Sequence, residues 1–301
     1  MSIKLSIEAL EVLDAIDREG SFSAAAESLY RVPSAITYTI RKLEDELGIS
    51  LFDRSGHKAR LTEAGNELLR EGRHLLKAAG ELECRVRRVA TGIETDISIA
   101  VSDILRLEPL YDILERFYAQ SFGTRVRLLR EVYGGSWDAL MSNRADISIG
   151  APGEGPPGGG YTTSLLGSVE FVFAVSPAHP LAMMPEPLSN SDIQQYRSIS
   201  AADSSRSLPA RTSGILDGQD VLSVPDIPSK TLAQIKGLGV GYLPRTLAEH
   251  HAAHGELVIL QVAEPKPSLV TCIAWRSQGG KAQQWLLHAL QQLDIKDFLL
   301  S

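Results

Sequence analysis

Pro33 constrains the fold of this chain more than any other residue. A proline has a fixed φ and no N–H donor, so it suits the first turn of a helix and disrupts a helix interior. The apolar residues that follow it at helical spacing are Ile36, Ile40, Leu43 and Leu47. The residues with polar or cationic tips on the opposite face are Ser34, Thr37, Tyr38 and Arg41. This pattern predicts a helix that begins at Pro33, with one buried side and one hydrogen-bonding side.

Two shorter helices are expected before Pro33. Ser6 suits the N-cap of the first, and Gly20 suits its end. Its apolar face is formed by Ala9, Val12, Leu13 and Ile16. The segment Ser23–Leu29 is rich in small residues, which lets a second helix approach its neighbours closely. A tight helical corner therefore leads into the helix at Pro33.

Two extended pieces follow this helix, at residues 51–54 and 59–62, around the glycine turn Ser55–Lys58. They predict a basic, two-stranded wing. Its cations are Arg54, His57, Lys58 and Arg60. Such cations hold the sugar-phosphate backbone of DNA or enter a minor groove, where the negative potential is enhanced.

Donors and acceptors that project together from one helix are what the reading of base edges in a major groove requires. The residues expected to contact DNA are Arg31, Ser34, Thr37, Tyr38, Arg41, Lys42, Arg54, His57, Lys58 and Arg60. The net charge of −7 argues against indiscriminate binding of polyanions, whereas a local cluster of cations favours site-directed binding. The alternative is an all-α core whose polar stripe is only a solvated face.

Length and composition indicate a soluble globular protein of two or three domains, with 301 residues, 44% apolar and 22% charged. The first residues lack the apolar core of a signal peptide, and no stretch reaches the roughly 18 apolar residues that span a bilayer. We therefore expect a cytoplasmic protein without a membrane partner. Cys84 and Cys272 have no companion at metal-ligand spacing and are expected to be free thiols.

From Thr62 the pattern changes to that of a long helix, with Thr62 as its cap and Glu63 near its positive end. Its apolar seam follows heptad spacing along Leu68, Leu75, Ala79, Leu82, Val86 and Val89. A narrow seam on so long a helix predicts a dimer through paired helices. The alternative is packing of this helix on the downstream domain.

Beyond Thr91 the chain alternates strands and helices, which predicts an α/β architecture with a parallel sheet. The first group has strands at 97–101, 125–132 and 146–149 and helices at 109–118 and 136–142. The second group has strands at 171–175, 197–200, 239–243 and 258–262 and a helix at 229–236. A strand at 270–275 and a helix at 281–293 follow a proline-marked crossover and are expected to rejoin the first group. Two lobes with two hinge connections result.

Four runs of the chain are specific when taken together: Gly20–Ala26, Ile40–Gly48, Leu51–Arg54 and Leu61–Gly65. With these runs the chain resembles the LysR-type transcriptional regulators. The resemblance implies a winged helix-turn-helix DNA-binding domain at 1–62, a linker helix at 63–92 that forms a homodimer, often within a homotetramer, and an effector-binding domain at 93–301. That domain is similar to periplasmic binding proteins, with lobe I at about 93–163 and 268–301 and lobe II at about 164–267. One departure stands at Val32–Thr37, where the family often has Ser-Gln-Pro-Ala-Leu-Ser, so the glutamine that commonly reads a base is absent.

A small organic effector, such as an organic acid or an aromatic compound, is expected between the lobes, because strand ends and helix N-termini meet a crevice there. The candidate residues are Ser102, Asp103, Glu131, Val132, Gly150, Ser200, Ala201 and Asp203. Serines and aspartates at strand ends also serve as caps or turn formers. Trp137 lines the pocket or fills the core.

The resemblance implies a regulator that binds operator DNA and affects RNA polymerase, and two other classes of protein are the alternatives. A metal-dependent enzyme would use His250, His251 and His254, but the run lies on a polar helix without a distant acid ligand. An exported solute-binding protein would lack the winged segment. The run Gly153–Gly158 matches GxGxxG only formally, since its prolines cannot donate to phosphate. The sequence predicts no catalysis, no cofactor and no metal.

Overall fold

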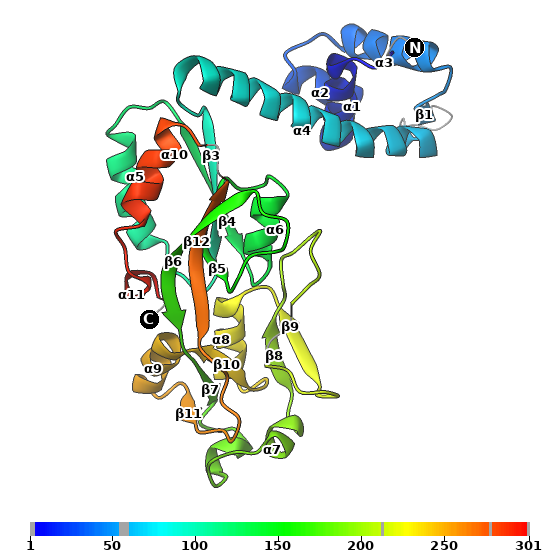
Figure 1. The fold of residues 1–301 in the computed structure, drawn as a ribbon. Helices are drawn as coiled ribbons and strands as arrows, with labels where there is room; N and C mark the ends of the chain where they lie inside the picture. The colour runs from blue at the N-terminus through cyan, green and yellow to red at the C-terminus, as the bar shows by residue number, and fades with distance from the viewer. Residues whose placement is uncertain (1–3, 54–59, 212–213, 277–278, 300–301) are drawn as a thin grey trace. The chain divides into compact units, whose positions relative to one another are not determined.

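The structure is a computed structural model that describes residues 4–53, 60–211, 214–276 and 279–299. The chain divides into two compact units, Met1–Ala90 and Thr91–Ser301. Figure 1 shows the helical elements of the first and the mixed α/β elements of the second. Among the helices in the described ranges, none is long and apolar enough to cross a membrane.

The N-terminal unit begins with three helices, α1 (Ile7–Glu19), α2 (Phe22–Ser28) and α3 (Pro33–Leu47). Ser6 caps α1, because its Oγ accepts a hydrogen bond from the N–H of Ala9 at 3.1 Å. Gly20 ends α1 in the left-handed conformation, with φ 72°, which only glycine adopts at little cost. The apolar stripe predicted for α3 is confirmed, since Ile36, Ile40 and Leu43 are buried against the other two helices.

A short hairpin and a long helix complete this unit. In the hairpin, β1 (Phe52–Asp53) pairs with β2 (Arg60–Leu61) in antiparallel register. The long helix α4 runs from Glu63 to Thr91. Thr62 caps it as expected, because its Oγ1 accepts from the N–H of Gly65 at 3.1 Å.

Lobe I of the C-terminal unit is built on a five-stranded sheet in the order β4-β3-β5-β12-β6. The strands are β3 (Asp96–Ser102), β4 (Arg125–Glu131), β5 (Ile147–Pro152), β6 (Tyr161–Val169) and β12 (Leu269–Arg276). The parallel arrangement predicted for the first group is confirmed, because β3 is parallel to β4 and β5. The complete sheet is mixed, since β12 is antiparallel to β5 and β6. The strand at Tyr161–Val169 was not predicted, since its apolar residues neither alternate nor form a run.

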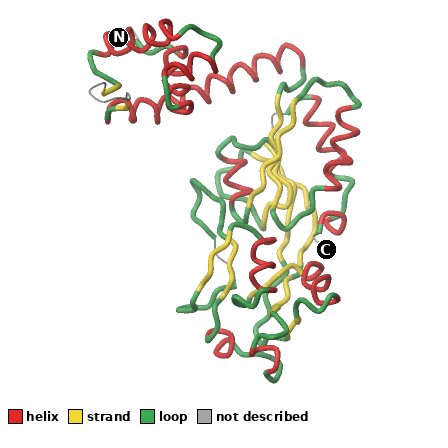
Figure 2. The backbone as a smooth tube through the Cα atoms, turned by 180° about the vertical axis from the view of Figure 1, so that it is seen from behind, coloured by secondary structure: helices red, strands yellow, loops and turns green. Residues whose placement is uncertain are grey.

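Helices cover both faces of this sheet (Figures 1 and 2). On one face lie α5 (Glu108–Tyr118), α10 (Lys281–Leu290) and α11 (Ile295–Phe298), whose buried residues share the largest apolar core. The other face carries α6 (Gly135–Met141), which packs through Trp137 and Leu140 against Ala151 and Ala274. The middle of the sheet is buried on both faces, since all six residues of β5 are buried.

Lobe II has two small sheets. The antiparallel one has the order β10-β7-β11, and β8 and β9 form a parallel pair. The strands are β7 (Phe171–Val175), β8 (Ser198–Ala201), β9 (Val221–Val224), β10 (Gly241–Pro244) and β11 (Val258–Leu260). The helical segments are η1 (Pro180–Met183), α7 (Asn190–Gln194), α8 (Ile227–Ile235) and α9 (Arg245–Ala253).

The chain crosses between the lobes twice, once from β6 into β7 and once from β11 into β12. The last strand therefore rejoins lobe I, as the proline-marked crossover predicted. The change of lobe suggested near residue 163 falls inside β6, which stays in the lobe I sheet until Val169.

Candidate DNA-reading and effector-binding sites

The face of α3 opposite the core is polar and open to solvent. Ser34, Tyr38 and Arg41 are exposed, and the Tyr38 side chain has 67% of its surface accessible. Pro33 occupies the first turn of α3, and the preceding Val32 makes no side-chain cap. These residues together with Thr37 are called the polar face of α3 below. It presents hydroxyl groups and one guanidinium on the outside of a well-anchored helix.

Thr37 is less open than its neighbours on this face. It is half-buried, and its Oγ1 donates a hydrogen bond to the carbonyl oxygen of Pro33 at 3.0 Å. The hydroxyl proton is therefore engaged within the helix, which is a common arrangement for threonine. Thr37 can therefore offer a binding partner a hydrogen-bond acceptor at Oγ1 and an apolar contact through its methyl group.

The cations around α3 differ in their partners. Arg31 forms an ion pair with Glu8 of α1, and Lys42 lies 3.9 Å from Glu46. Arg41 makes no ion pair with any residue that the structure describes. Pairs as exposed as these are weak, so a phosphate can replace the carboxylate at Arg31 or Lys42 at small cost.

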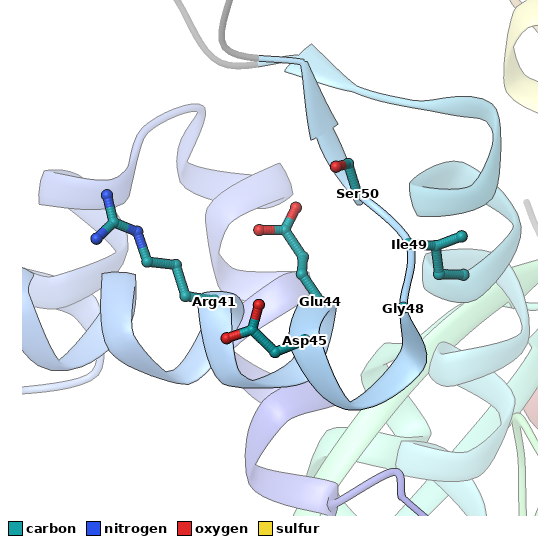
Figure 3. Close-up of a pocket in the computed structure, with 6 residues that line it drawn as sticks. All are labelled: Arg41, Glu44, Asp45, Gly48, Ile49 and Ser50. Atoms are coloured by element: carbon teal, nitrogen blue, oxygen red, sulfur yellow. The ribbon is translucent and has the colours of Figure 1, made fainter.

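A pocket lies at the C-terminal end of α3 (Figure 3), lined by Arg41, Glu44, Asp45, Gly48, Ile49 and Ser50. Its two carboxylates make it a poor receptor for phosphate. Glu44 has a structural role instead: Oε1 accepts hydrogen bonds from the N–H groups of Leu51 at 2.7 Å and Phe52 at 3.1 Å. The carboxylate thereby ties α3 to the first strand of the hairpin.

The hairpin holds the base of the predicted wing. Arg60 is exposed in β2 opposite Asp53, and the ring of Phe52 packs edge-on against Phe22 of α2 at 5.1 Å. The predicted wing cations Arg54, His57 and Lys58 lie outside the described residues.

Helix α4 changes character along its length. Near its start Leu69 is buried, Gly72 lies against Leu10 of α1, and Arg73 contacts the carboxylates of Asp14 at 2.7 Å and Asp17 at 2.8 Å. Two acids of α1 therefore pair with the first half of α4. Further along α4, four residues of the predicted seam are exposed. Their accessible fractions are 49% for Leu75, 55% for Leu82, 61% for Val86 and 84% for Val89.

The structure brings the expected effector residues to the region where the lobes meet. Ser102 ends β3, Glu131 ends β4, and Ser200 and Ala201 end β8. Gly150 was expected just after its strand but lies inside β5, with φ 79°, where a Cβ would meet Ser102 and Leu105 below 3 Å. Seven of the eight candidates are buried, and Asp203 is half-buried.

Two carboxylates of this set join the lobes directly. Asp103 of lobe I accepts from the N–H of Ile227, in the first turn of α8 in lobe II, at 2.8 Å. Asp203 of lobe II accepts from the N–H of Gly134, at the start of α6 in lobe I, at 3.1 Å. Each lobe thus sends an acid to a helix N-terminus of the other, where backbone donors and the helix dipole favour negative charge.

Glu131 anchors a third link. Its carboxylate pairs with Arg144 and accepts from the hydroxyl of Ser204 of lobe II, whose Oγ also accepts from the N–H of Val132 at 2.9 Å. A Cβ at Gly135 would stand 1.9 Å from Ser204 Oγ, so only glycine allows this approach. Sequence reasoning missed Ser204, because nothing in its local pattern reveals a partner more than 70 residues away.

Arg144 also contacts Asp138 at 2.9 Å. Burial pushes the pKa of the Asp138 carboxyl upward, but hydrogen bonds from Arg144 and from the N–H groups of Ser207 and Leu208 outweigh it, so this pKa lies below its ordinary value. The group stays charged and holds the loop after β8 against α6.

Burial disturbs the ionisation of other groups at this junction. It raises the pKa of Asp103 to about 6, although the hydrogen bond from Ile227 and the charge of Arg130 oppose the shift. Burial, reinforced by the nearby charge of Lys266, lowers the pKa of Lys230 to about 7. Sequence reasoning did not single out either lysine.

The structure also locates the other residues that the sequence analysis considered, namely Trp137, the two cysteines and the run Gly153–Gly158. Trp137 is fully buried, with its indole N–H donating to the Pro152 carbonyl at 3.0 Å, so it fills the core. Cys272 is a buried free thiol whose pKa burial raises to about 11. The side chain of Cys84 lies outside the described ones. The run Gly153–Gly158 falls in the loop between β5 and β6.

The histidine run of α9 is engaged in local contacts. His251 Nδ1 pairs with Glu256 at 2.7 Å, and His254 Nδ1 lies 2.8 Å from the His250 carbonyl oxygen. Within the described part of the chain, no group of three or more His, Cys, Asp or Glu side chains could hold a metal ion.

Comparison with known proteins gives matches along nearly the whole chain. Residues 7–66 match the bacterial regulatory helix-turn-helix protein, lysR family, and residues 90–294 match the LysR substrate binding domain. The uncharacterized HTH-type transcriptional regulator YeeY of Escherichia coli strain K12 is 41% identical, over 94% of this chain and 92% of its own.

Two solved structures have a similar fold. Full-length CbnR in complex with its target DNA has a TM-score of 0.60 at 16% identity, covering 96% of this chain and 99% of its own. Full-length LysG from Corynebacterium glutamicum with bound effector Arg has a TM-score of 0.50 at 21% identity, covering 99% and 100%.

Proposed function

Because the chain belongs to the LysR family of bacterial helix-turn-helix regulators, we propose that the polar face of α3 reads the base edges of an operator. The protein is a DNA-binding transcriptional regulator with an effector-binding domain, and not an enzyme. The observation that carries the proposal is that Ser34, Tyr38 and Arg41 are exposed together, opposite a buried stripe. Without the family's usual glutamine, base contacts fall to Ser34, Thr37 and Tyr38.

The cations around this face position the protein on the duplex. Arg41 and Lys42 on α3, Arg31 before it and Arg60 on the hairpin contact phosphates, together with the wing residues Arg54, His57 and Lys58. Phosphate contacts set register and orientation and make affinity depend on salt, whereas base contacts set the preferred sequence.

A small organic effector binds where the lobes meet, among Ser102, Asp103, Glu131, Val132, Gly150, Ser200, Ala201 and Asp203. The proposal is supported by the direct links between the lobes through Asp103 and Asp203. An effector that favours one lobe arrangement over another shifts the population of that arrangement, and only a difference in affinity between the two can do so. The shift changes how the dimers sit on DNA, and with it their spacing or the bend they impose.

The exposed seam of α4 supports a homodimer through this helix, since Leu82, Val86 and Val89 form an exposed apolar row along the second half of a long helix. Two dimers assemble into a homotetramer, and the complex affects transcription through RNA polymerase. The protein acts in the cytoplasm, where its DNA is, and no cofactor takes part.

The test begins by selecting bound sequences from random duplex DNA with the full chain. Arg41→Ala should weaken binding about tenfold across all bound sequences and reduce the salt dependence by about one phosphate contact. Arg127→Ala, at an exposed arginine of β4, is the matched control and should bind like the wild type. If Arg41→Ala binds DNA with unchanged affinity and salt dependence, α3 does not lie against the duplex, and its polar face cannot be the surface that reads the bases.

A further inference from the structure

Lys230 of α8 is a buried cation whose charge the fold does not neutralise. Its side chain is 3% exposed and forms neither a hydrogen bond nor an ion pair with any residue in the described ranges. An ammonium in such a place is costly unless an anion compensates it. The cost shows in the ionisation of the group, because burial and then the charge of Lys266 lower the pKa of Lys230.

The position of Lys230 is defined by its neighbours on α8 and β10. Ile227, one turn earlier, is the residue bound by Asp103 of lobe I. The Nζ of Lys230 lies 3.2 Å from the point where a Cβ on Gly241 would stand, so the glycine leaves room for the ammonium. Lys230 therefore lies in lobe II beside the helix turn that lobe I contacts.

Gln234 adds a second unsatisfied group on the same face of α8, one turn after Lys230. Its Nε2 donates to the carbonyl oxygens of Ala174 at 2.7 Å and Gly241 at 3.0 Å. Its Oε1 is buried without a hydrogen-bond partner among the described residues. A free donor and a free acceptor on one helix face are what a small polar ligand with an anionic end would satisfy.

A second cation comes from the crossover between β11 and β12. Lys266 Nζ lies 4.1 Å from the ring centre of Phe171 and 6.0 Å from that of Tyr242, the residue after Gly241. Burial lowers the pKa of Lys266 to about 8. Asp103 is the acid whose charge acts on Lys230, and its carboxylate already accepts from Ile227. The acid whose charge acts on Lys230 is therefore already engaged by the N–H of Ile227 and by the charge of Arg130.

We propose that Lys230, with Lys266 beside it, receives the oxyanion of the effector, so that the ligand is a small organic carboxylate or phosphate. The inference rests on the proposed function, because it specifies the ligand class of the site between the lobes. Binding at this position would also allow the ligand to change how the two lobes are arranged. Its anion sits on α8, the helix whose first turn Asp103 holds, and beside one of the two crossovers.

The experiment measures the thermal unfolding of the full chain at constant ionic strength and about pH 6.5, below the pKa of Lys230 of about 7, so that more than half of the Lys230 side chains are protonated. The probes are acetate, succinate, benzoate and inorganic phosphate, each on the order of 10 mM, with acetamide, succinamide and benzamide as neutral counterparts. We expect at least one oxyanion to raise the Tm, and its neutral counterpart to leave it unchanged. A rise with a carboxylate but not with phosphate would identify the ligand as a carboxylate, and the opposite result would identify it as a phosphate.

Three variants locate the effect. Lys230→Met should abolish the rise in Tm, and Lys266→Met should weaken the binding of the same anion about tenfold. Lys236→Met is the matched control, because Lys236 is exposed at the end of the same helix. If Lys230→Met fails to fold, Lys266→Met carries the comparison with this control.

Three outcomes would overturn the subsite: no oxyanion raises the wild-type Tm, the rise persists in Lys230→Met, or the amides act as well as the acids. A rise that persists in the variant marks a general ion effect on surface charge. The readout needs no DNA. A Lys230-dependent rise without any change in DNA protection would keep the subsite and reject ligand control. A neutral compound that alters DNA protection would support ligand control of DNA binding and reject the oxyanion subsite.

Discussion

The polar face of α3 and the junction between the lobes use the same kinds of side chain in opposite surroundings. On α3, Tyr38 and Arg41 are exposed and reach outward. At the junction, Asp103 and Glu131 are buried and already hold backbone or side-chain partners from the other lobe. Water satisfies an exposed polar group when no ligand is bound, so its exposure costs little free energy. A buried polar group destabilises the fold unless it has a hydrogen-bond partner. Changes on the polar face of α3 should therefore affect binding alone, and changes at the junction should affect stability as well.

Glu131→Ala should give the largest effect. It leaves Arg144, whose side chain is 17% exposed, without one of its two acids and removes the link to Ser204. We expect a loss of about 4 kcal/mol in the free energy of unfolding, measured with urea, because the largely buried guanidinium of Arg144 keeps only Asp138 as an acid and the hydroxyl of Ser204 loses its acceptor. The control is Glu154→Ala, at an exposed acid in the loop after β5. Equal stability of the two variants would contradict the contrast between surface and junction.

Lys230→Met should be more stable than the wild type near pH 7 when no anion is present. Lys230 titrates at about 7 in the folded chain and at 10.5 when unfolded, so between these values the unfolded chain binds more protons. Wild-type stability relative to the variant therefore rises from pH 7 to pH 10, by about 3 kcal/mol. Asp103 and Lys266, which act on the same group, remain in both proteins.

Urea unfolding across this pH range tests the prediction. A gap that stays constant with pH would mean that Lys230 is not held as a buried charge.

Glu44→Ala should cost about 1.5 kcal/mol, because two backbone N–H groups of the hairpin lose their acceptor. Its neighbour in the same pocket provides the control, since Asp45 is exposed at the adjacent position. Thermal unfolding of Asp45→Ala should match the wild type. If the two variants behave alike, the carboxylate of Glu44 does not hold the hairpin.

Tyr38→Phe should give the smallest effect, with stability within about 0.5 kcal/mol of the wild type, because the side chain is 67% exposed. The loss of one hydroxyl should change the preference among bound DNA sequences by about 1 kcal/mol. Selection from random DNA with both proteins measures this. Identical sequence preferences would remove Tyr38 from the reading surface.

The N-terminal elements were predictable because local signals agree there. Ser6, Gly20 and Thr62 cap or end helices through contacts within four residues, and Pro33 begins α3 as expected. The spacing of Ile36 and Ile40 depends only on helix geometry. Such contacts need no knowledge of distant segments.

The junction was predictable only in outline. Strand ends at Ser102, Glu131 and Ser200 could be anticipated, but not that Asp103 would meet Ile227 or that Asp203 would meet Gly134. Lys230 gave no signal, since a lysine in a short amphipathic helix ordinarily points to solvent. The antiparallel placement of β12 and β6 likewise depends on pairing between segments some 100 residues apart.

The residues of this chain were sufficient to identify a winged helix-turn-helix, a long apolar-seamed helix and a two-lobed α/β domain, because helix caps, periodicity and family motifs are local properties. Which acid faces which helix, which lysine is buried and where the lobes touch were decided by the tertiary structure. The physical reason is that burial and pairing arise from chain segments that approach only on folding, and these set the charge state of a side chain.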